Sequence, residues 1–292
     1  PPTRPSWARP SRAAQSLCRC SPVRMGEISA ATANDYRAGA GSSVTAHPHP
    51  APNHDEECAV GNELPPMNGR VLILGAGWVG SRLASALSAS GSLVTVTNRP
   101  GLTSRPKEAY FAPVPLSDPP VSRLEFDLSR PETWTNLPPP ESLAGAVLTF
   151  QAGIEDASAF YDAYLCRVPK VLAYSSTAVY RVDTPGQPVD EKTPLKQTAR
   201  VGLDAMLLRR GATVLTISGI FGEPRGARGV CTCLAAYASS GGALNGQKAV
   251  NMVHVDDIIA ATAHVLVTPS ISGTRLNVGG DYFRLHELMC HC

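Results

Sequence analysis

The fold of this chain is decided by one stretch, Arg70-Val71-Leu72-Ile73-Leu74-Gly75-Ala76-Gly77-Trp78-Val79-Gly80. It opens with an apolar run that is too continuous for a strand with one exposed face and is typical of a parallel strand buried on both faces. Residues 81–90 then carry apolar side chains at helical spacing, and Gly91 follows as a natural helix end. Residues 93–97 are a second, β-branched strand. The sequence therefore predicts a strand, a glycine turn, a helix and a second strand in succession.

The three glycines of this stretch have the spacing G-x-G-x-x-G and stand between a strand and a helix. We expect Gly75 to allow the tight turn, Gly77 to let the backbone approach a pyrophosphate, and Gly80 to let the helix pack closely on the strand. Phosphates would then meet the free N–H groups at the positive end of the helix. The predicted cofactor-binding residues of this turn are Gly75, Ala76, Gly77, Trp78, Val79 and Gly80. The alternative is a glycine-rich turn that binds no ligand.

The end of the second strand indicates which dinucleotide is bound. Sites specific for NAD place an Asp or Glu about 20 residues after the glycine motif begins, where it accepts hydrogen bonds from the ribose. Asn98 and Arg99 stand there instead, and a guanidinium can contact the 2′-phosphate of NADP with two of its nitrogens. The sequence therefore favours NADP over NAD, with Asn98 and Arg99 in the cofactor site. The alternative is that Arg99 is a solvated loop residue.

The later segments continue the alternation of strands and helices. Residues 143–150, 171–175 and 214–217 are apolar and predict strands. Helices are predicted at 157–166 and at 257–267, the second capped by Asp256 and ended by Pro269. This alternation predicts an α/β fold with a doubly wound parallel sheet, whose ligand lies at the carboxyl ends of the strands.

Residues 1–66 differ in composition from the rest of the chain. They are rich in Pro, Ala, Ser, Gly, Arg and His without a sustained apolar period, so we expect a disordered leader and place the folded domain at 67–292. The leader has no acidic residue before Glu27 but has five arginines, Arg4, Arg9, Arg12, Arg19 and Arg24. That composition suits a transit peptide for a plastid or another organelle. Against it, a start at Met25 would leave a leader with several acids, and the protein would then be cytoplasmic.

Charge and cysteine content argue against several other classes of protein. The formal net charge is +2, and the central region has no run of basic residues that could neutralise a row of phosphates, so no nucleic-acid partner is expected. No apolar stretch approaches the roughly 18 residues of a membrane span. Three C-x-C pairs suggest a metal site, but their spacing is not that of structural zinc knuckles, so free thiols are favoured and no metal is predicted. The eight cysteines are Cys18, Cys20, Cys58, Cys166, Cys231, Cys233, Cys290 and Cys292.

Five motifs occur in the order seen in the NAD-dependent epimerase/dehydratase family, and the chain resembles atypical members of these extended short-chain dehydrogenases and reductases. The motifs are the glycine stretch, Phe126-Asp127-Leu128, Tyr174-Ser175-Ser176-Thr177-Ala178-Val179-Tyr180, Ser218-Gly219-Ile220-Phe221-Gly222 and Val253-His254-Val255-Asp256-Asp257. The resemblance spans about residues 69–282 and implies a Rossmann core with a smaller C-terminal substrate lobe. Because the chain ends soon after Tyr282, where relatives continue, we expect a truncated lobe.

The resemblance also implies catalytic residues. Such enzymes use a hydroxyl at the end of a strand to bind the reacting oxygen, which assigns that role to Ser176. They also use a Tyr followed four residues later by a Lys as the proton-transfer pair, and this chain contains no Tyr-x-x-x-Lys. Lys196 and Arg200 stand where the pair would be, and Lys196 could act as a base only if burial or a nearby cation lowered its pKa. Tyr180 is not a substitute, because its family counterpart lies outside the dyad.

Two hypotheses of different class follow. The first, which we favour, is an NADP-dependent oxidoreductase or nucleotide-sugar epimerase-like enzyme that acts on a small molecule, for example a sugar nucleotide. The second is a catalytically silent dinucleotide-binding sensor or regulatory protein, since a general acid or base is worth roughly 10²–10⁴ in rate. Further departures from the family pattern, Arg181 for a Gly and Thr216 for an Arg, affect catalysis more than binding.

Overall fold

A computed structural model of the chain describes residues 64, 67–100, 121–184, 186–222, 249–280 and 282–285. The predicted leader therefore lies outside the described residues except for Leu64, and so do all the cysteines except Cys166. The division at residue 66 stays a prediction.

The first strand, helix and second strand form as the sequence predicts. They are β1 (Arg70–Leu74), α2 (Trp78–Ala89) and β2 (Leu93–Asn98). One boundary was wrong, because the helix begins at Trp78 and not at Ser81. The glycine turn is thus shorter than expected, and its last glycine lies within the first turn of the helix.

The central sheet has seven strands in the order β3-β2-β1-β4-β5-β6-β9, and all its pairings are parallel. The chain moves outward from β1 on one side and then from β4 on the other, which confirms the doubly wound, Rossmann-type sheet. The order changes direction between β1 and β4, and sheets of this kind bind ligands at the carboxyl ends of the strands at such a point. The further strands are β3 (Val121–Glu125), β4 (Leu143–Leu148), β5 (Val171–Ser176), β6 (Thr213–Ile217) and β9 (Arg275–Val278).

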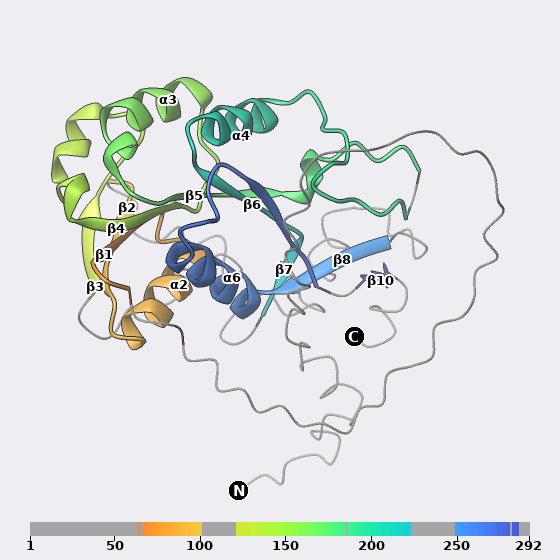
Figure 1. Ribbon diagram of the computed structural model, residues 1–292, viewed down its shortest axis with the longest axis horizontal. Helices are drawn as coiled ribbons and strands as arrows, with labels where there is room; N and C mark the ends of the chain where they lie inside the picture. The colour runs from red at the N-terminus through yellow and green to blue at the C-terminus, as the bar shows by residue number, and fades with distance from the viewer. Residues whose placement is uncertain are drawn as a thin grey trace, which may run out of the picture.

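Helices cover both faces of this sheet (Figure 1). α2 and α6 (Val255–Val267) pack on one face, and α3 (Ile154–Ala163) and α4 (Ala199–Arg209) on the other. Alternate side chains of β1 enter the two cores, Val71 and Ile73 into the first and Leu72 and Leu74 into the second. Each such apolar side chain stabilises the fold by about 1.5–3 kcal/mol when fully buried. This explains why β1 is apolar at every position after Arg70.

Two predicted elements differ in their ends. The strand expected at 143–150 ends at Leu148, because the hydroxyl of Thr149 donates to the carbonyls of Leu74 (3.0 Å) and Gly75 (2.8 Å). The helix expected at 157–166 runs from Ile154 to Ala163 and is followed by a 3-10 turn, η4 (Leu165–Arg167). Other 3-10 turns are η2 (Pro131–Asn136), η3 (Pro140–Ser142) and η5 (Thr177–Val179).

The cap of α6 is also corrected. His254, and not Asp256, is the N-cap residue, and its Nδ1 accepts the amide hydrogen of Asp256 at 3.3 Å. The Asp256 carboxylate instead contacts Arg82 of α2 at 3.1 Å, so it links the two helices on this face of the sheet. The helix ends at Val267, two residues before Pro269 as expected.

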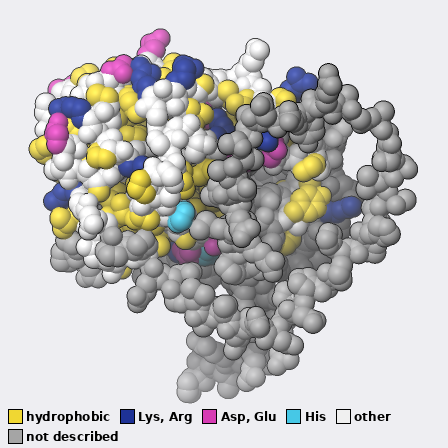
Figure 2. Space-filling view, viewed as in Figure 1, with side chains coloured by type: hydrophobic (Ala, Val, Ile, Leu, Met, Phe, Trp, Pro, Cys, Tyr) yellow, Lys and Arg dark blue, Asp and Glu magenta, His cyan; other side chains and the backbone are white. Residues whose placement is uncertain are grey.

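A second, three-stranded sheet lies beside the first in the order β10-β8-β7 (Figure 1). Its strands are β7 (Gly219–Phe221), β8 (Ala249–His254) and β10 (Tyr282–Arg284). Whether it is part of a truncated substrate lobe stays a prediction. No helix within the described ranges is long and apolar enough to span a membrane. On the face shown in Figure 2, Lys and Arg side chains of the described residues are interspersed with Asp and Glu.

Candidate functional site

The glycine turn is held rigidly between β1, β2 and β4. The amides of Gly75 and Ala76 donate to the hydroxyl and the carbonyl of Thr97, at 3.0 and 2.8 Å. Gly75 has a φ of +100°, and a Cβ there would lie 2.7 Å from the Thr149 hydroxyl. A Cβ on Gly80 would lie only 2.0 Å from the carbonyl oxygen of Gly75. Both glycines are therefore needed for the turn itself, as the sequence predicts.

Gly77 differs from the other two, because a Cβ built on it would meet nothing within 4 Å. It is exposed, and it is the N-cap of α2, whose first turn holds no acidic residue. The positive end of the helix is thus bare of side chains at this residue and uncompensated by carboxylates within its first turn. This open cradle of backbone fits a diphosphate.

The other predicted residues of the turn have different roles. The side chains of Ala76 and Trp78 are buried in the apolar core, and that of Val79 is half-buried. Ala76 and Trp78 can therefore offer a ligand mainly their backbone. Trp78 also lies under the Arg82 guanidinium, whose carbon is 5.8 Å from the ring centre.

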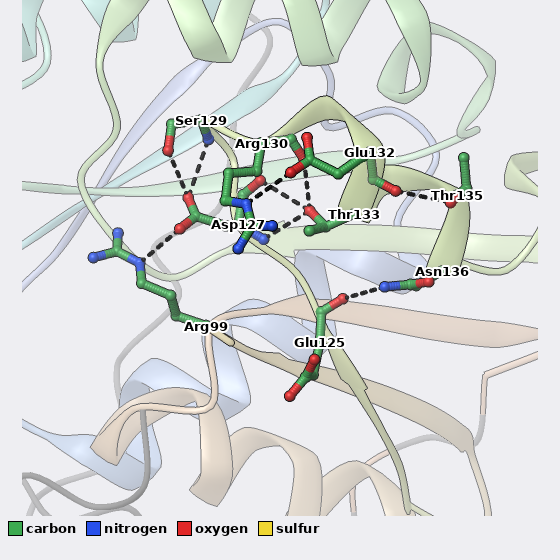
Figure 3. Close-up of polar contacts among 9 residues, drawn as sticks. All are labelled: Arg99, Glu125, Asp127, Ser129, Arg130, Glu132, Thr133, Thr135 and Asn136. Carbon is green, nitrogen blue, oxygen red and sulfur yellow. Dashed lines mark hydrogen bonds and ion pairs between the residues drawn. The ribbon is translucent and has the colours of Figure 1, made fainter. Parts of the chain in front are cut away.

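Asn98 and Arg99 lie at the carboxyl end of β2, beside the glycine turn. The carbonyl of half-buried Asn98 accepts the amide hydrogen of Phe126 at 2.9 Å, so its backbone is used in the sheet. The Arg99 side chain is 61% exposed, and its Nε lies 3.4 Å from Oδ2 of Asp127 (Figure 3). Arg99 is therefore exposed, as a solvated loop residue would be, but it is not free, because a carboxylate holds one edge of its guanidinium.

Asp127 is a site residue to which sequence reasoning assigned no role. Its Oδ1 accepts hydrogen bonds from the amide and the hydroxyl of Ser129, at 3.1 and 2.8 Å (Figure 3). These hydrogen bonds, helped by the charges of Arg99 and Arg130, hold the pKa of Asp127 below its ordinary value. The Asp-x-Ser spacing of this turn is the signal that could have identified it.

Ser176 ends β5 at the same edge of the sheet. It is half-buried, and its hydroxyl accepts the Ala178 amide hydrogen at 3.3 Å. Lys196 is brought to the same turn, because its amide donates to the carbonyl of Val179 and its Nζ to that of Ala178, at 2.8 and 2.9 Å. The Lys196 side chain is exposed. The structure therefore places the two predicted catalytic residues beside one turn, with Lys196 on the solvent side.

The side chains of Tyr180 and Arg200 contact Asn277 and Gln151. Tyr180 is buried, its hydroxyl donates to Oδ1 of Asn277 at 2.5 Å, and burial raises its pKa. Arg200 lies in the first turn of α4, where it contacts the Gln151 side chain at 2.8 Å. The helix itself begins at Ala199 with Thr198 as its cap, so Lys196 precedes the helix.

A buried ion pair lies beneath Ser176 and was not predicted. Asp204 of α4 and Arg275 of β9 are 3.0 Å apart, and both side chains are almost fully buried. The hydroxyl of Ser175 donates to Asp204 at 2.6 Å, and Arg275 donates to the Thr216 hydroxyl at 2.9 Å. A guanidinium from the neighbouring strand thus reaches Thr216, the position at which the resemblance led us to expect an Arg. No group of three or more metal-ligating side chains occurs in the described part of the chain, and Cys166 there is exposed and free.

The fold and the turn together define a Rossmann-type domain with the fold of the extended short-chain dehydrogenases and reductases. Among similar solved structures are UDP-glucose 4-epimerase from Thermotoga maritima with UDP-glucose (17% identity, TM-score 0.56, 76% of this chain and 80% of that chain) and the Bordetella bronchiseptica enzyme WbmH in complex with NAD⁺ (17%, 0.57, 75% and 78%). Vestitone reductase from alfalfa is another, with 19% identity and a TM-score of 0.56 over 76% of this chain and 80% of that chain. No family model and no curated protein matches the sequence. At such identities the likeness shows the fold.

Proposed function

We propose that this protein binds a nicotinamide dinucleotide across the carboxyl edge of its sheet and is an oxidoreductase or a nucleotide-sugar epimerase-like enzyme. The observation that carries the proposal is the open backbone at Gly77, at the start of α2 and beside the sheet's change of direction. When bound, the dinucleotide supplies hydride chemistry. Neighbours in fold are an epimerase with UDP-glucose, an enzyme with NAD⁺ and a reductase, which supports a sugar nucleotide or another small carbonyl compound as substrate.

We infer a preference for NADP(H) from Arg99. This residue lies at the end of β2 and is exposed, and it carries the positive charge that a 2′-phosphate requires. Titration of the protein with NADPH and NADH, followed by nucleotide fluorescence, tests the preference. We expect NADPH to bind more tightly, and Arg99→Ala to weaken NADPH binding by roughly tenfold while NADH binding stays within about twofold, since a charge-assisted hydrogen bond contributes about 1.5–3 kcal/mol. Tighter binding of NADH by the unaltered protein would overturn the assignment.

We assign to Ser176 the hydrogen bond to the reacting oxygen of the substrate. Its place at the end of β5 supports the role, and neighbouring Lys196 can hold a negatively charged substrate group without transferring a proton. We expect slow hydride transfer with a panel of sugar nucleotides and small carbonyl compounds, and at least tenfold slower transfer in Ser176→Ala with unchanged NADPH affinity. We expect Lys196→Ala to weaken the binding of negatively charged substrates. Lys192→Ala, which changes another exposed lysine of the same loop, is the matched control and should leave that binding unchanged.

A silent sensor or regulatory protein is the second candidate. The observation that favours it concerns two side chains near the Ser176 turn. Tyr180 is buried against Asn277, and Lys196 is exposed. NADPH binding without any turnover across the substrate panel would support this candidate. Turnover that is lost in Ser176→Ala would exclude it.

A further inference from the structure

The carboxylate that contacts Arg99 is itself fixed by the turn that follows β3. Both hydrogen bonds from Ser129 go to Oδ1 of Asp127, which leaves Oδ2 for Arg99. The backbone of Asp127 is held as well, because its amide donates to the Thr133 hydroxyl at 3.0 Å and its carbonyl accepts from that hydroxyl at 3.1 Å. The Asp127 side chain is only 13% exposed. Asp127 is therefore a well-fixed acceptor beside an exposed partner.

The contact with Asp127 also orients the guanidinium. Asp127 meets Arg99 at Nε, on the inner edge of the group. Figure 3 shows the two terminal nitrogens of Arg99 turned away from Asp127. These two nitrogens form the edge with which a guanidinium grips a phosphate in a bidentate manner. A long, exposed arginine without such a partner would distribute itself over many rotamers, and ordering it on binding would weaken the complex.

We propose that Asp127 is a positioning residue that makes the protein select NADP(H), by holding the Arg99 guanidinium with its terminal edge toward the 2′-phosphate. The inference rests on the proposed function, because it requires a dinucleotide at the glycine turn. Asp127 acts through Arg99 and does not itself contact the phosphate. Its negative charge repels the phosphate, and the proposal states that the gain from orientation exceeds this repulsion.

The test compares NADPH and NADH affinities in Asp127→Asn and in a matched control. Glu132→Gln is the control, because Glu132 lies in the following 3-10 turn and its carboxylate contacts Arg130 Nε at 2.8 Å, also in an ion pair. Each change removes one negative charge from the same region, and only the first removes the contact with Arg99. We expect Asp127→Asn to weaken NADPH binding roughly three- to fivefold, the upper part of the range for exposed ion pairs, and Glu132→Gln to leave it within about twofold. NADH affinity should stay within about twofold in both.

A double-mutant cycle separates positioning from a merely structural role. In the Arg99→Ala background, Asp127→Asn should cause no further loss of NADPH affinity, because the residue through which it acts is gone. A further loss of the same size would overturn the proposal, and so would unchanged or tighter NADPH binding in Asp127→Asn alone. Binding of neither nucleotide by the unaltered protein would instead refute the proposed function. If Asp127→Asn and the unaltered protein have equal melting temperatures, the difference in affinity is one between two folded proteins.

Discussion

At the scale of single residues, Gly77 and Gly80 of the same turn differ in the room that a side chain would have at each position. Gly80 faces the carbonyl oxygen of Gly75, where a methyl group has no room, whereas Gly77 faces open space. The fold therefore requires glycine at position 80 but not at position 77, where the proposed function gives the missing side chain a role. Both glycines belong to the same sequence motif. Only the atoms around each Cα show which glycine the fold needs and which one could serve a ligand.

This difference leads to a paired prediction. Gly80→Ala should destabilise the protein by about 1–3 kcal/mol, the range for overpacking, because the 2.0 Å contact involves the backbone and cannot be relieved by a side chain. Gly77→Ala should cost at most about 1 kcal/mol, the difference between Gly and Ala as an N-cap, yet weaken NADPH binding. Urea denaturation and nucleotide titration of both variants check this. Equal losses of stability would contradict the assignment.

At the scale of elements, the ion pair of Asp204 and Arg275 joins α4 to β9 under the end of β5. Ser175 donates to Asp204 and Arg275 donates to Thr216, so four elements meet at one buried group of polar side chains. Ser176 is the next residue after Ser175, and its position depends on this support. We expect this buried pair to fix the end of β5.

Removal of one partner should therefore be costly. Asp204→Ala leaves the Arg275 charge buried without its carboxylate, and a broken buried pair costs about 3–5 kcal/mol. Asp162→Ala is the matched control, because it breaks the pair with Arg210, at 2.8 Å, in which Asp162 is 62% exposed. That change should cost about 1 kcal/mol or less. Urea denaturation of both variants measures the difference, and a similar cost for the two would show that the buried pair contributes little.

At the scale of the whole molecule, folding buries several tyrosines that ordinarily titrate near pH 10. Burial raises the pKa of Tyr161 and Tyr180 and raises that of Tyr164 to about 12. Their hydroxyls reach carbonyl or amide oxygens, those of Arg210, Asn277 and Pro138. Each folded-state pKa lies above the unfolded one, so the protonated tyrosines contribute stability that is fully present below about pH 10.

The predicted consequence is alkaline unfolding. As the pH rises from about 10 toward 12, the unfolded chain releases tyrosine protons that the folded chain retains, so the free energy of unfolding falls. Tyr164→Phe should flatten this dependence, although it also removes the hydrogen bond to Pro138. Stability measured in urea at several pH values, together with the ultraviolet absorbance of tyrosinate, checks the prediction. A flat profile up to pH 12 in the unaltered protein would refute it.

The sequence by itself determined the first strand, helix and strand, the glycine turn and the parallel sheet, because each depends on apolar spacing and on glycines a few residues apart. Only the tertiary structure decided that Arg99 meets Asp127, that Asp204 meets Arg275, and that Lys196 lies beside the Ser176 turn. The ends of neighbouring parallel strands come together whatever the length of chain between them. The residues that meet at that edge therefore have no regular spacing in the sequence from which their contacts could have been predicted.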